Sequence, residues 1–170
     1  MSQADPYRLH RATAADHAWV REVRLRALQE DPDAFGSTHA REKDRTPKEW
    51  AAFAGRPEAA TFLVLAGGRP VGIASGSPYR PPSTQVGLFG MWVAPEARGQ
   101  GLGGRLVDAV IAWAWAAGHR RLHLDVGDAN EAAIRLYASR GFEPTGVTGA
   151  VDPERPHITE HERALDLHGP

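Results

Sequence analysis

The sequence predicts an α/β fold in which helices pack on one mixed β-sheet. Several short segments alternate apolar and polar residues, as half-buried strands do, and other segments carry apolar residues at helical spacing. Glycine, proline or a helix cap separates each segment from the next. The resulting order is β-α-α-β-β-β-α-β-α-β-β, with antiparallel strands early and parallel strands around the two later helices. At 170 residues, 1–170 is expected to be a single domain.

Helix caps mark the first half of the chain. Thr13 and Asp16 have the spacing of a capping box, and Thr46 and Glu49 repeat it with a proline at the first helical position. Gly67-Gly68 predicts a hairpin turn between two strands. The elements expected here are strand Tyr7–Arg11, a helix from Thr13 to about Gln29, a helix from Pro47 to near Gly55, and strands Thr61–Ala66 and Pro70–Ser75.

Glycines end the helices of the second half. Gly118 and Gly141 are expected just beyond two amphipathic helices, where a left-handed residue closes the last turn. The expected elements are strand Gln85–Val93, a helix from Leu102 to about Ala117, strand Leu122–Val126, helix Asn130–Arg140, and strands Phe142–Val147 and Ile158–Leu167. The last of these is expected as an exposed edge strand that could pair with a second copy, giving a homodimer.

Composition excludes several function classes. The chain has 20 basic and 21 acidic residues and a net charge of -1, which disfavours nucleic acid as a partner. It has no cysteine, and therefore no disulfide, thiolate nucleophile or cysteine-ligated zinc. Residues Met1–His10 are polar, unlike a secretory signal, and the longest apolar run is about half of what a bilayer requires. A soluble, cytoplasmic protein with no membrane contact is expected.

A zinc-protease pattern occurs near the C-terminus. His157-Ile158-Thr159-Glu160-His161 has the form H-x-x-E-H, which binds metal when both histidines share a helix face. On the strand expected here, four residues span ~13 Å, too far for one metal ion. No metal is expected.

A glycine-rich loop joins a strand to a helix. The segment Arg98-Gly99-Gln100-Gly101-Leu102-Gly103-Gly104-Arg105 places four glycines within six residues at the start of the helix. The free N–H groups of that first turn would face an approaching anion, and the two arginines could add charge. The lysine and hydroxyl of a Walker loop are missing, and the glycine spacing of the dinucleotide fingerprint does not fit. The loop therefore predicts a phosphate or pyrophosphate site of another kind.

Two motifs resemble the GCN5-related N-acetyltransferase family. Arg98-x-x-Gly101-x-Gly103 is similar to the loop with which that family binds the pyrophosphate of acetyl-coenzyme A, and Met91-Trp92-Val93-Ala94-Pro95 resembles its fourth strand. Asn130-x-x-Ala133-x-x-x-Tyr137-x-x-x-Gly141-Phe142 resembles a second motif. Together they span about 85–147, the expected acetyl-CoA-binding core. The resemblance implies the family's fold, a mixed six- to seven-stranded sheet flanked by about four helices.

The resemblance also implies how acetyl-CoA would bind. The loop would hold the pyrophosphate, and backbone groups of the fourth strand would bind the pantetheine arm and polarise the acetyl carbonyl. The residues implied are Met91, Trp92, Val93, Arg98, Gly99, Gln100, Gly101, Leu102, Gly103, Gly104, Arg105, Asn130 and Tyr137.

Acetyl transfer to an amine requires a base for the ammonium and an acid for the departing thiolate. Tyr137 matches the family's helix tyrosine and is the candidate acid. The family's fourth-strand glutamate is missing from Gln85–Val93. Asp125 resembles the fifth-strand carboxylate of the ribosomal-protein N-terminal acetyltransferases and is the candidate base, acting directly or through water. His123, Glu42 and Asp44 remain alternatives.

The sequence thus predicts an N-acetyltransferase that moves acetyl directly from acetyl-CoA to a primary amine, since no cysteine is present for a thiol relay. The alternative is a non-catalytic acyl-CoA-binding or sensing domain of the same fold. Ala34–Thr38 resembles a stretch of bacterial family members that shapes the acceptor pocket, which makes Phe35, Ser37 and Thr38 candidate substrate contacts. The acceptor, a small molecule or a peptide amine, is not identified by the sequence.

Overall fold

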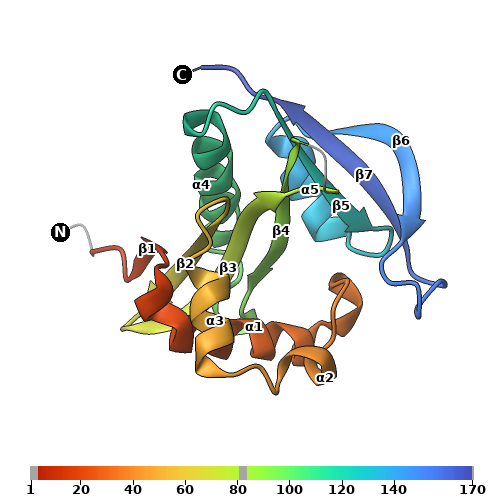
Figure 1. Cartoon of the computed structure of the whole chain (residues 1–170). Helices are drawn as coiled ribbons and strands as arrows, with labels where there is room; N and C mark the ends of the chain where they lie inside the picture. The colour runs from red at the N-terminus through yellow and green to blue at the C-terminus, as the bar shows by residue number, and fades with distance from the viewer. Residues whose placement is uncertain (1–3, 81–83, 170) are drawn as a thin grey trace.

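Seven strands form one sheet in the order β1-β2-β3-β4-β5-β7-β6 (Figure 1). The structure is a computed structural model that describes residues 4–80 and 84–169, so the first residues of the polar Met1–His10 stretch lie outside it. The strands are β1 Tyr7–Arg11, β2 Ala60–Ala66, β3 Arg69–Pro78, β4 Val86–Val93, β5 Arg121–Gly127, β6 Glu143–Ala150 and β7 Thr159–Asp166. The helices are α1 His17–Glu30, α2 His39–Glu42, α3 Pro47–Ala54, α4 Leu102–Ala116 and α5 Glu131–Ser139.

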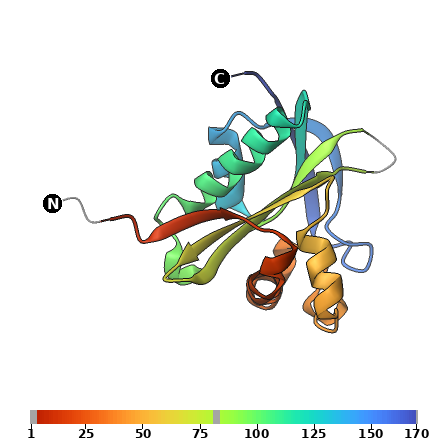
Figure 2. The same ribbon diagram turned by 60° about the vertical axis from the view of Figure 1, so that its left-hand side comes forward.

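Helices cover both faces of the sheet. Figure 2 shows α1 and α3 on one side and α4 and α5 on the other. The apolar stripe of α4 follows from its predicted spacing: Leu106 and Val110 are fully buried against the sheet. On the opposite face Val20 and Val23 of α1 are equally buried. The predicted α/β class and mixed sheet are therefore confirmed.

The predicted caps form, with one shift. The Thr46 hydroxyl accepts from the Glu49 N–H at 3.2 Å, and the Glu49 carboxylate accepts from the Thr46 N–H at 2.6 Å. The capping box of Thr13 is also present, but it opens a single 3-10 turn, and α1 begins only at His17. The four-residue α2 was not expected from the sequence because it lacks the length for a periodic pattern.

The two central strands diverge. β4 runs parallel to β5 only at Val86↔Leu122 and Gly87↔His123. Beyond that point β4 is bulged against β3 around Gly90, whose φ of 60° is a left-handed conformation that glycine adopts without strain. The edge of β4 that faces β5 is left without a ladder partner from Leu88 onward. A gap therefore opens in the middle of the sheet.

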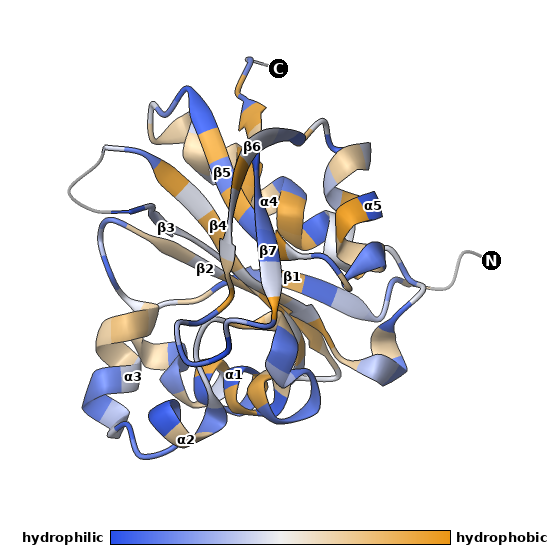
Figure 3. Cartoon of the chain, turned by 90° about the vertical axis from the view of Figure 1, so that its right-hand side faces the viewer, coloured by the Kyte–Doolittle hydropathy of each residue, from blue (hydrophilic) through white to orange (hydrophobic). Residues whose placement is uncertain are grey.

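The last strand is not at the edge of the sheet, contrary to the sequence prediction. β7 pairs antiparallel with both β5 and β6, and β6 forms the edge. β5 and β6 run in the same direction but are not neighbours, because β7 fills the space between them. The prediction was wrong because strand order depends on pairing between distant parts of the chain, which no local pattern specifies. β7 is polar, as its mostly blue colour in Figure 3 shows. Its polarity reflects a sheet face that no helix covers. The homodimer expected from an exposed Ile158–Leu167 edge loses that basis.

Within the described residues, no helix is long and apolar enough to cross a bilayer.

Candidate active site

A cleft of about 890 Å³ lies where β4 and β5 separate. The end of α1 with the following turn, β4, the glycine loop, the end of β5 and the start of β7 all contribute to its walls. The lining residues are Glu30, Asp31, Pro32, Asp33, Ala34, Met91, Trp92, Val93, Ala97, Arg98, Gly99, Gly101, Leu102, Gly103, Gly104, Gly127, Asp128, Ala129, Asn130, Ala132, Ala133, Leu136, His157, Ile158 and Thr159. Its size suits an elongated ligand.

The glycine loop has the form predicted for an anion cradle. Gly101 is the N-cap of α4 with φ 73° and ψ 13°, so the free N–H groups of the first helical turn begin beside it. A Cβ at Gly101 would meet no atom within 4 Å, and Gly101 is one of the residues that line the cleft. A phosphate can therefore approach the backbone and the positive end of the helix dipole.

Most of the predicted cofactor residues line this cleft. They are Met91, Trp92, Val93, Arg98, Gly99, Gly101, Leu102, Gly103, Gly104 and Asn130. Gln100, Arg105 and Tyr137 do not belong to the lining. The Arg105 guanidinium donates to Asp5 at 2.8 Å and to the Tyr7 carbonyl at 3.3 Å, so it ties α4 to the start of the chain instead of facing a ligand.

Arg98 is already oriented by the protein. Its Nε donates to the Val93 carbonyl at 2.9 Å, and a terminal nitrogen donates to Asp31 at 3.0 Å. The Trp92 indole N–H donates to the same Asp31 oxygen at 2.6 Å. Asp31 thus joins the end of α1 to β4 and to the loop, and it holds the arginine at the rim of the cleft.

Asn130 and Tyr137 occupy positions that the helix motif requires. The Asn130 side chain accepts from the Ala133 N–H at 3.3 Å and caps α5. Tyr137 lies two turns further along the helix, 6% exposed, and its ring meets Phe142 edge-on. Burial raises the pKa of the Tyr137 hydroxyl, so it remains protonated at neutral pH. Among the described residues it has no hydrogen-bond partner, which leaves its proton available.

The opposite face of β5 and β7 carries three carboxylates, Asp125, Glu160 and Glu162, which we call the carboxylate cluster. The Tyr79 hydroxyl donates to Glu162 at 2.6 Å and lies 3.2 Å from Asp125. His123 stacks on the Tyr79 ring with centroids 5.0 Å apart. The predicted strand alternation, with His123 and Asp125 on one face, is therefore confirmed.

Arg80 compensates part of this negative charge. Its guanidinium is 3.3 Å from Asp125 and 3.5 Å from Glu162. Burial, followed by the negative charge of Asp125, raises the pKa of Glu160 to about 7. A carboxyl group with that pKa can take up and release protons near neutral pH.

Sequence reasoning missed Tyr79, Arg80 and Glu162, and it considered Glu160 only as part of a metal motif. Alternation along β7 would have placed Glu160 and Glu162 on one face. Nothing in the sequence indicates that β7 lies beside β5, so their proximity to Asp125 could not be foreseen. The exposed Phe89 of β4, whose ring centroid lies 6.1 Å from that of Tyr79, was also missed.

The three predicted substrate contacts have structural roles. Phe35 is 4% exposed and lies under the Arg24 guanidinium, while Thr38 caps α2. The carbonyls of Phe35 and Ser37 accept from Arg155 at 2.6 Å and 3.5 Å. Direct contact of these residues with an acceptor stays a prediction; the preceding residues, 31–34, are the ones that line the cleft.

The alternative base Glu42 is committed to an ion pair. It is 3% exposed and accepts two hydrogen bonds from Arg24, at 3.1 Å and 2.9 Å. The described residues contain no group of three or more His, Cys, Asp or Glu that could hold a metal ion. His157 and His161 do not share a helix face, because His161 belongs to β7.

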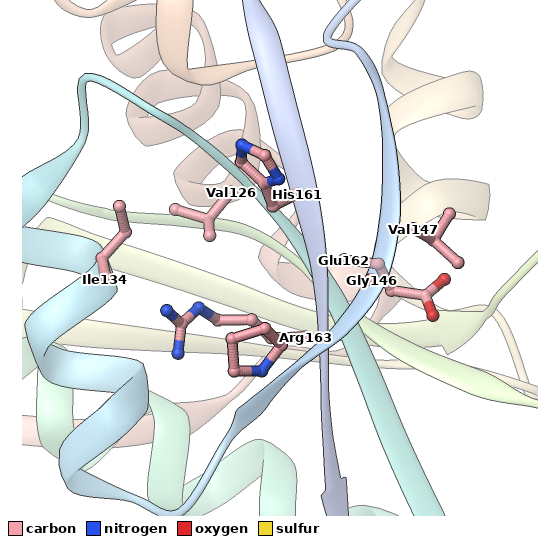
Figure 4. Close-up of a pocket in the computed structure, with 8 residues that line it drawn as sticks. Val126, Ile134, Gly146, Val147, His161, Glu162 and Arg163 are labelled. Atoms are coloured by element: carbon pink, nitrogen blue, oxygen red, sulfur yellow. The ribbon is translucent and has the colours of Figure 1, made fainter.

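A smaller cavity of about 160 Å³ lies between α5, β6 and β7 (Figure 4). Val126, Ile134 and Val147 form much of its lining. Figure 4 also shows Glu162 projecting to the opposite side of β7 from His161 and Arg163. This alternation places Glu160, two residues earlier, on the same side as Glu162.

Comparison with known proteins agrees with this geometry. A model of the acetyltransferase (GNAT) family matches residues 24–142. N-acetyltransferase family 8 member 2 of Rattus norvegicus is 36% identical over 88 residues, 50% of this chain and 39% of that protein. Phosphinothricin N-acetyltransferase of Alcaligenes faecalis is 36% identical over 87 residues, 49% of this chain and 44% of that protein. The match thus spans less than half the length of these curated relatives.

Solved structures share the fold over nearly the whole chain. An acetyltransferase of the GNAT family from Streptococcus pneumoniae has a TM-score of 0.78 at 24% identity, covering 95% of this chain and 99% of the other. The yncA acetyltransferase from Salmonella typhimurium, whose structure contains acetyl-CoA, has a TM-score of 0.79 at 21% identity, covering 98% and 96%.

Proposed function

The chain belongs to the acetyltransferase (GNAT) family, and from that premise we propose that it transfers the acetyl group of acetyl-CoA directly to a primary amine. The observation that carries this proposal is the cleft, which joins the glycine loop at the start of α4 to the unpaired edge of β4. One end suits a pyrophosphate and the other an amide-containing arm, and these are the two recognition elements of coenzyme A.

The unpaired edge of β4 supplies the second half of cofactor recognition. From Leu88 onward its backbone groups toward β5 lack ladder partners, and an extended pantetheine arm can take the place of a missing strand. Met91, Trp92 and Val93 line this part of the cleft. A backbone N–H here would polarise the thioester carbonyl and stabilise the oxyanion that forms on attack.

Transfer proceeds without a covalent enzyme intermediate. The amine nitrogen attacks the acetyl carbonyl carbon; a C–N bond forms, and the C–S bond breaks. Tyr137 donates its proton to the departing thiolate, a role that its buried, protonated and unpartnered hydroxyl supports. A carboxylate of the cluster on β5 and β7, of which Asp125 is the one predicted from the sequence, accepts the proton lost by the ammonium.

The proposed acceptor is a small-molecule or peptide amine. The carboxylate cluster suits an ammonium group, and the exposed Phe89 offers an apolar surface next to it. No charge pattern distinguishes a polyamine from an N-terminal peptide.

Thiol release from acetyl-CoA, measured over a panel of an alkylamine, a polyamine, an N-terminal peptide and an aminoglycoside, tests the proposal. Turnover with at least one amine, with mass spectrometry locating the acetyl group on nitrogen, is the expected result. Tight acetyl-CoA binding without thiol release across the panel would instead favour a non-catalytic acyl-CoA-binding domain.

A further inference from the structure

We propose that Glu160, and not Asp125, is the general base, and that Asp125 is a positioning residue that sets the charge around it. This assignment rests on the proposed acetyl transfer. It gives a function to the glutamate of the H-x-x-E-H segment, whose last three residues, 159–161, belong to strand β7.

Glu160 stands at the open end of the carboxylate cluster, beside the cleft. Its strand neighbour Thr159 and its cross-strand partner Gly127 both line that cleft. Its partner on the other side is Gly149 of β6. A Cβ at Gly149 would meet no atom within 4 Å. Because both lateral neighbours are glycines, no side chain in register covers the Glu160 carboxylate, and a substrate ammonium has room next to it.

The other two carboxylates are already committed. Glu162 accepts from Tyr79 at 2.6 Å and from Thr145 at 2.8 Å. Asp125 lies within 3.2–3.3 Å of the Tyr79 hydroxyl and the Arg80 guanidinium. Within the described residues, no donor is hydrogen-bonded to Glu160. A base must accept the incoming proton, and in this cluster Glu160 is the carboxylate to which no hydrogen-bond donor of the described residues is already bound.

The surrounding charges also match this role. The charged groups that face Glu160 are Asp125 from β5, Arg80 after β3 and Glu162 on its own strand, and β6 contributes only Gly149 at this level. Burial and Asp125 together hold the pKa of Glu160 near 7, with Arg80 opposing them. A base is most effective when its pKa is near the working pH. Asp125 is instead already hydrogen-bonded to Tyr79 and Arg80.

The protons of the reaction balance when Glu160 acts as the general base. The substrate arrives as an ammonium, and Glu160 removes one proton to free the nitrogen lone pair. The nitrogen attacks, and as the tetrahedral adduct collapses Tyr137 protonates the departing thiolate while the second proton leaves the nitrogen and replaces the one that Tyr137 has given up. The net reaction converts ammonium and thioester to amide, thiol and one proton, which leaves through Glu160 to solvent.

The test is the pH dependence of kcat/KM with the best amine of the panel. Wild type is expected to show an acid limb with a midpoint near pH 7. Glu160→Gln is expected to lower kcat/KM at pH 7 by ~100-fold or more. The acid limb near pH 7 should also disappear from its profile. Its kcat/KM should instead rise with pH until the amine itself is deprotonated, near pH 10 for an alkylamine. Asp125→Asn is expected to keep the limb but move it to lower pH, because a neighbouring negative charge is removed.

Glu143→Gln, at an exposed position of β6, is the matched control and is expected to behave as wild type. Thermal melting and acetyl-CoA affinity, both expected to be unchanged in Glu160→Gln, separate catalysis from folding and cofactor binding. An acid limb that persists in Glu160→Gln and vanishes in Asp125→Asn would overturn the assignment in favour of Asp125. Absence of turnover in wild type with every amine would instead refute the proposed function.

Discussion

Replacement of Gly101 by alanine tests whether the glycine loop binds acetyl-CoA through its backbone. Gly101 has φ 73° and ψ 13°, a left-handed conformation. An alanine there costs ~1–2 kcal/mol, of which ~0.4–1 kcal/mol is offset by the smaller entropy of the unfolded chain. The expected net loss is about 1 kcal/mol, which lowers Tm by ~2–4 °C in a chain of this size.

The effect on binding is separate and larger. The new methyl group meets no protein atom within 4 Å, and Gly101 lines the cleft where the pyrophosphate is expected, so we expect the methyl group to hinder the approach of the phosphate to the backbone. Loss of one charge-assisted hydrogen bond to phosphate costs ~1.5–3 kcal/mol. The Kd for acetyl-CoA is therefore expected to rise at least ~10-fold.

Gly67→Ala is the matched control. Gly67 has φ 57°, has equally open space around its Cβ, and lies in the β2–β3 turn, outside the cleft lining. Isothermal titration with acetyl-CoA and thermal melting are measured on both variants. Both should lose a similar amount of stability, and only Gly101→Ala should lose affinity. Equal affinities of the two variants would refute the claim that this loop cradles the cofactor.

Three further outcomes follow from the structure. Tyr137→Phe is expected to lower kcat by ~100-fold, since it removes the acid but keeps the packing. The Kd for acetyl-CoA, measured by titration, should not change. An unchanged kcat would rule out Tyr137 as the general acid. The Arg41 guanidinium lowers the pKa of Asp152 to about 2. The ionised carboxylate therefore stabilises the fold above about pH 4, and this contribution is lost as the pH falls toward 2. The Tm of Asp152→Asn should lie below that of wild type at pH 7, and the difference between the two Tm values should disappear on acidification. Leu106→Ala, at a fully buried site, should cost ~2–5 kcal/mol in urea unfolding, whereas Leu9→Ala, 38% exposed, should stay within ~0.5 kcal/mol.

The geometry of the proposed cofactor side could be predicted because its determinants are contiguous in the sequence. Gly101, Gly103 and the preceding strand residues are proposed to act mainly through their backbone, and a local motif specifies backbone geometry. The exceptions are informative. Arg105 follows the glycines directly, yet its guanidinium turns to Asp5, about a hundred residues away in the chain. A local pattern gives the position of a long side chain but not the direction in which it turns.

The acceptor side could not be predicted because its residues meet only through strand order. Tyr79 contacts Glu162 across 83 positions, and this pairing depends on β7 lying between β5 and β6. A polar strand is normally assigned to an edge, since interior strands are expected to bury both faces. One face of β7 carries Glu160 and Glu162, which lie beside Asp125 of β5. The polarity of this strand is therefore compatible with an interior position, and we assign that face to the proposed acceptor side.

The proposed cofactor side and acceptor side are expected to respond differently to substitution. Backbone recognition on the cofactor side tolerates many side chains, so the loop can be conserved in form while the rest of the sequence changes. In the proposed mechanism, proton transfer on the acceptor side depends on a few side chains, and the pKa of Glu160 responds to its charged neighbours. Neutralising Asp125 changes the charge that acts on Glu160, and altering Arg80 changes it in the opposite direction. The working pH is therefore expected to change when this cluster is altered, while acetyl-CoA affinity stays constant.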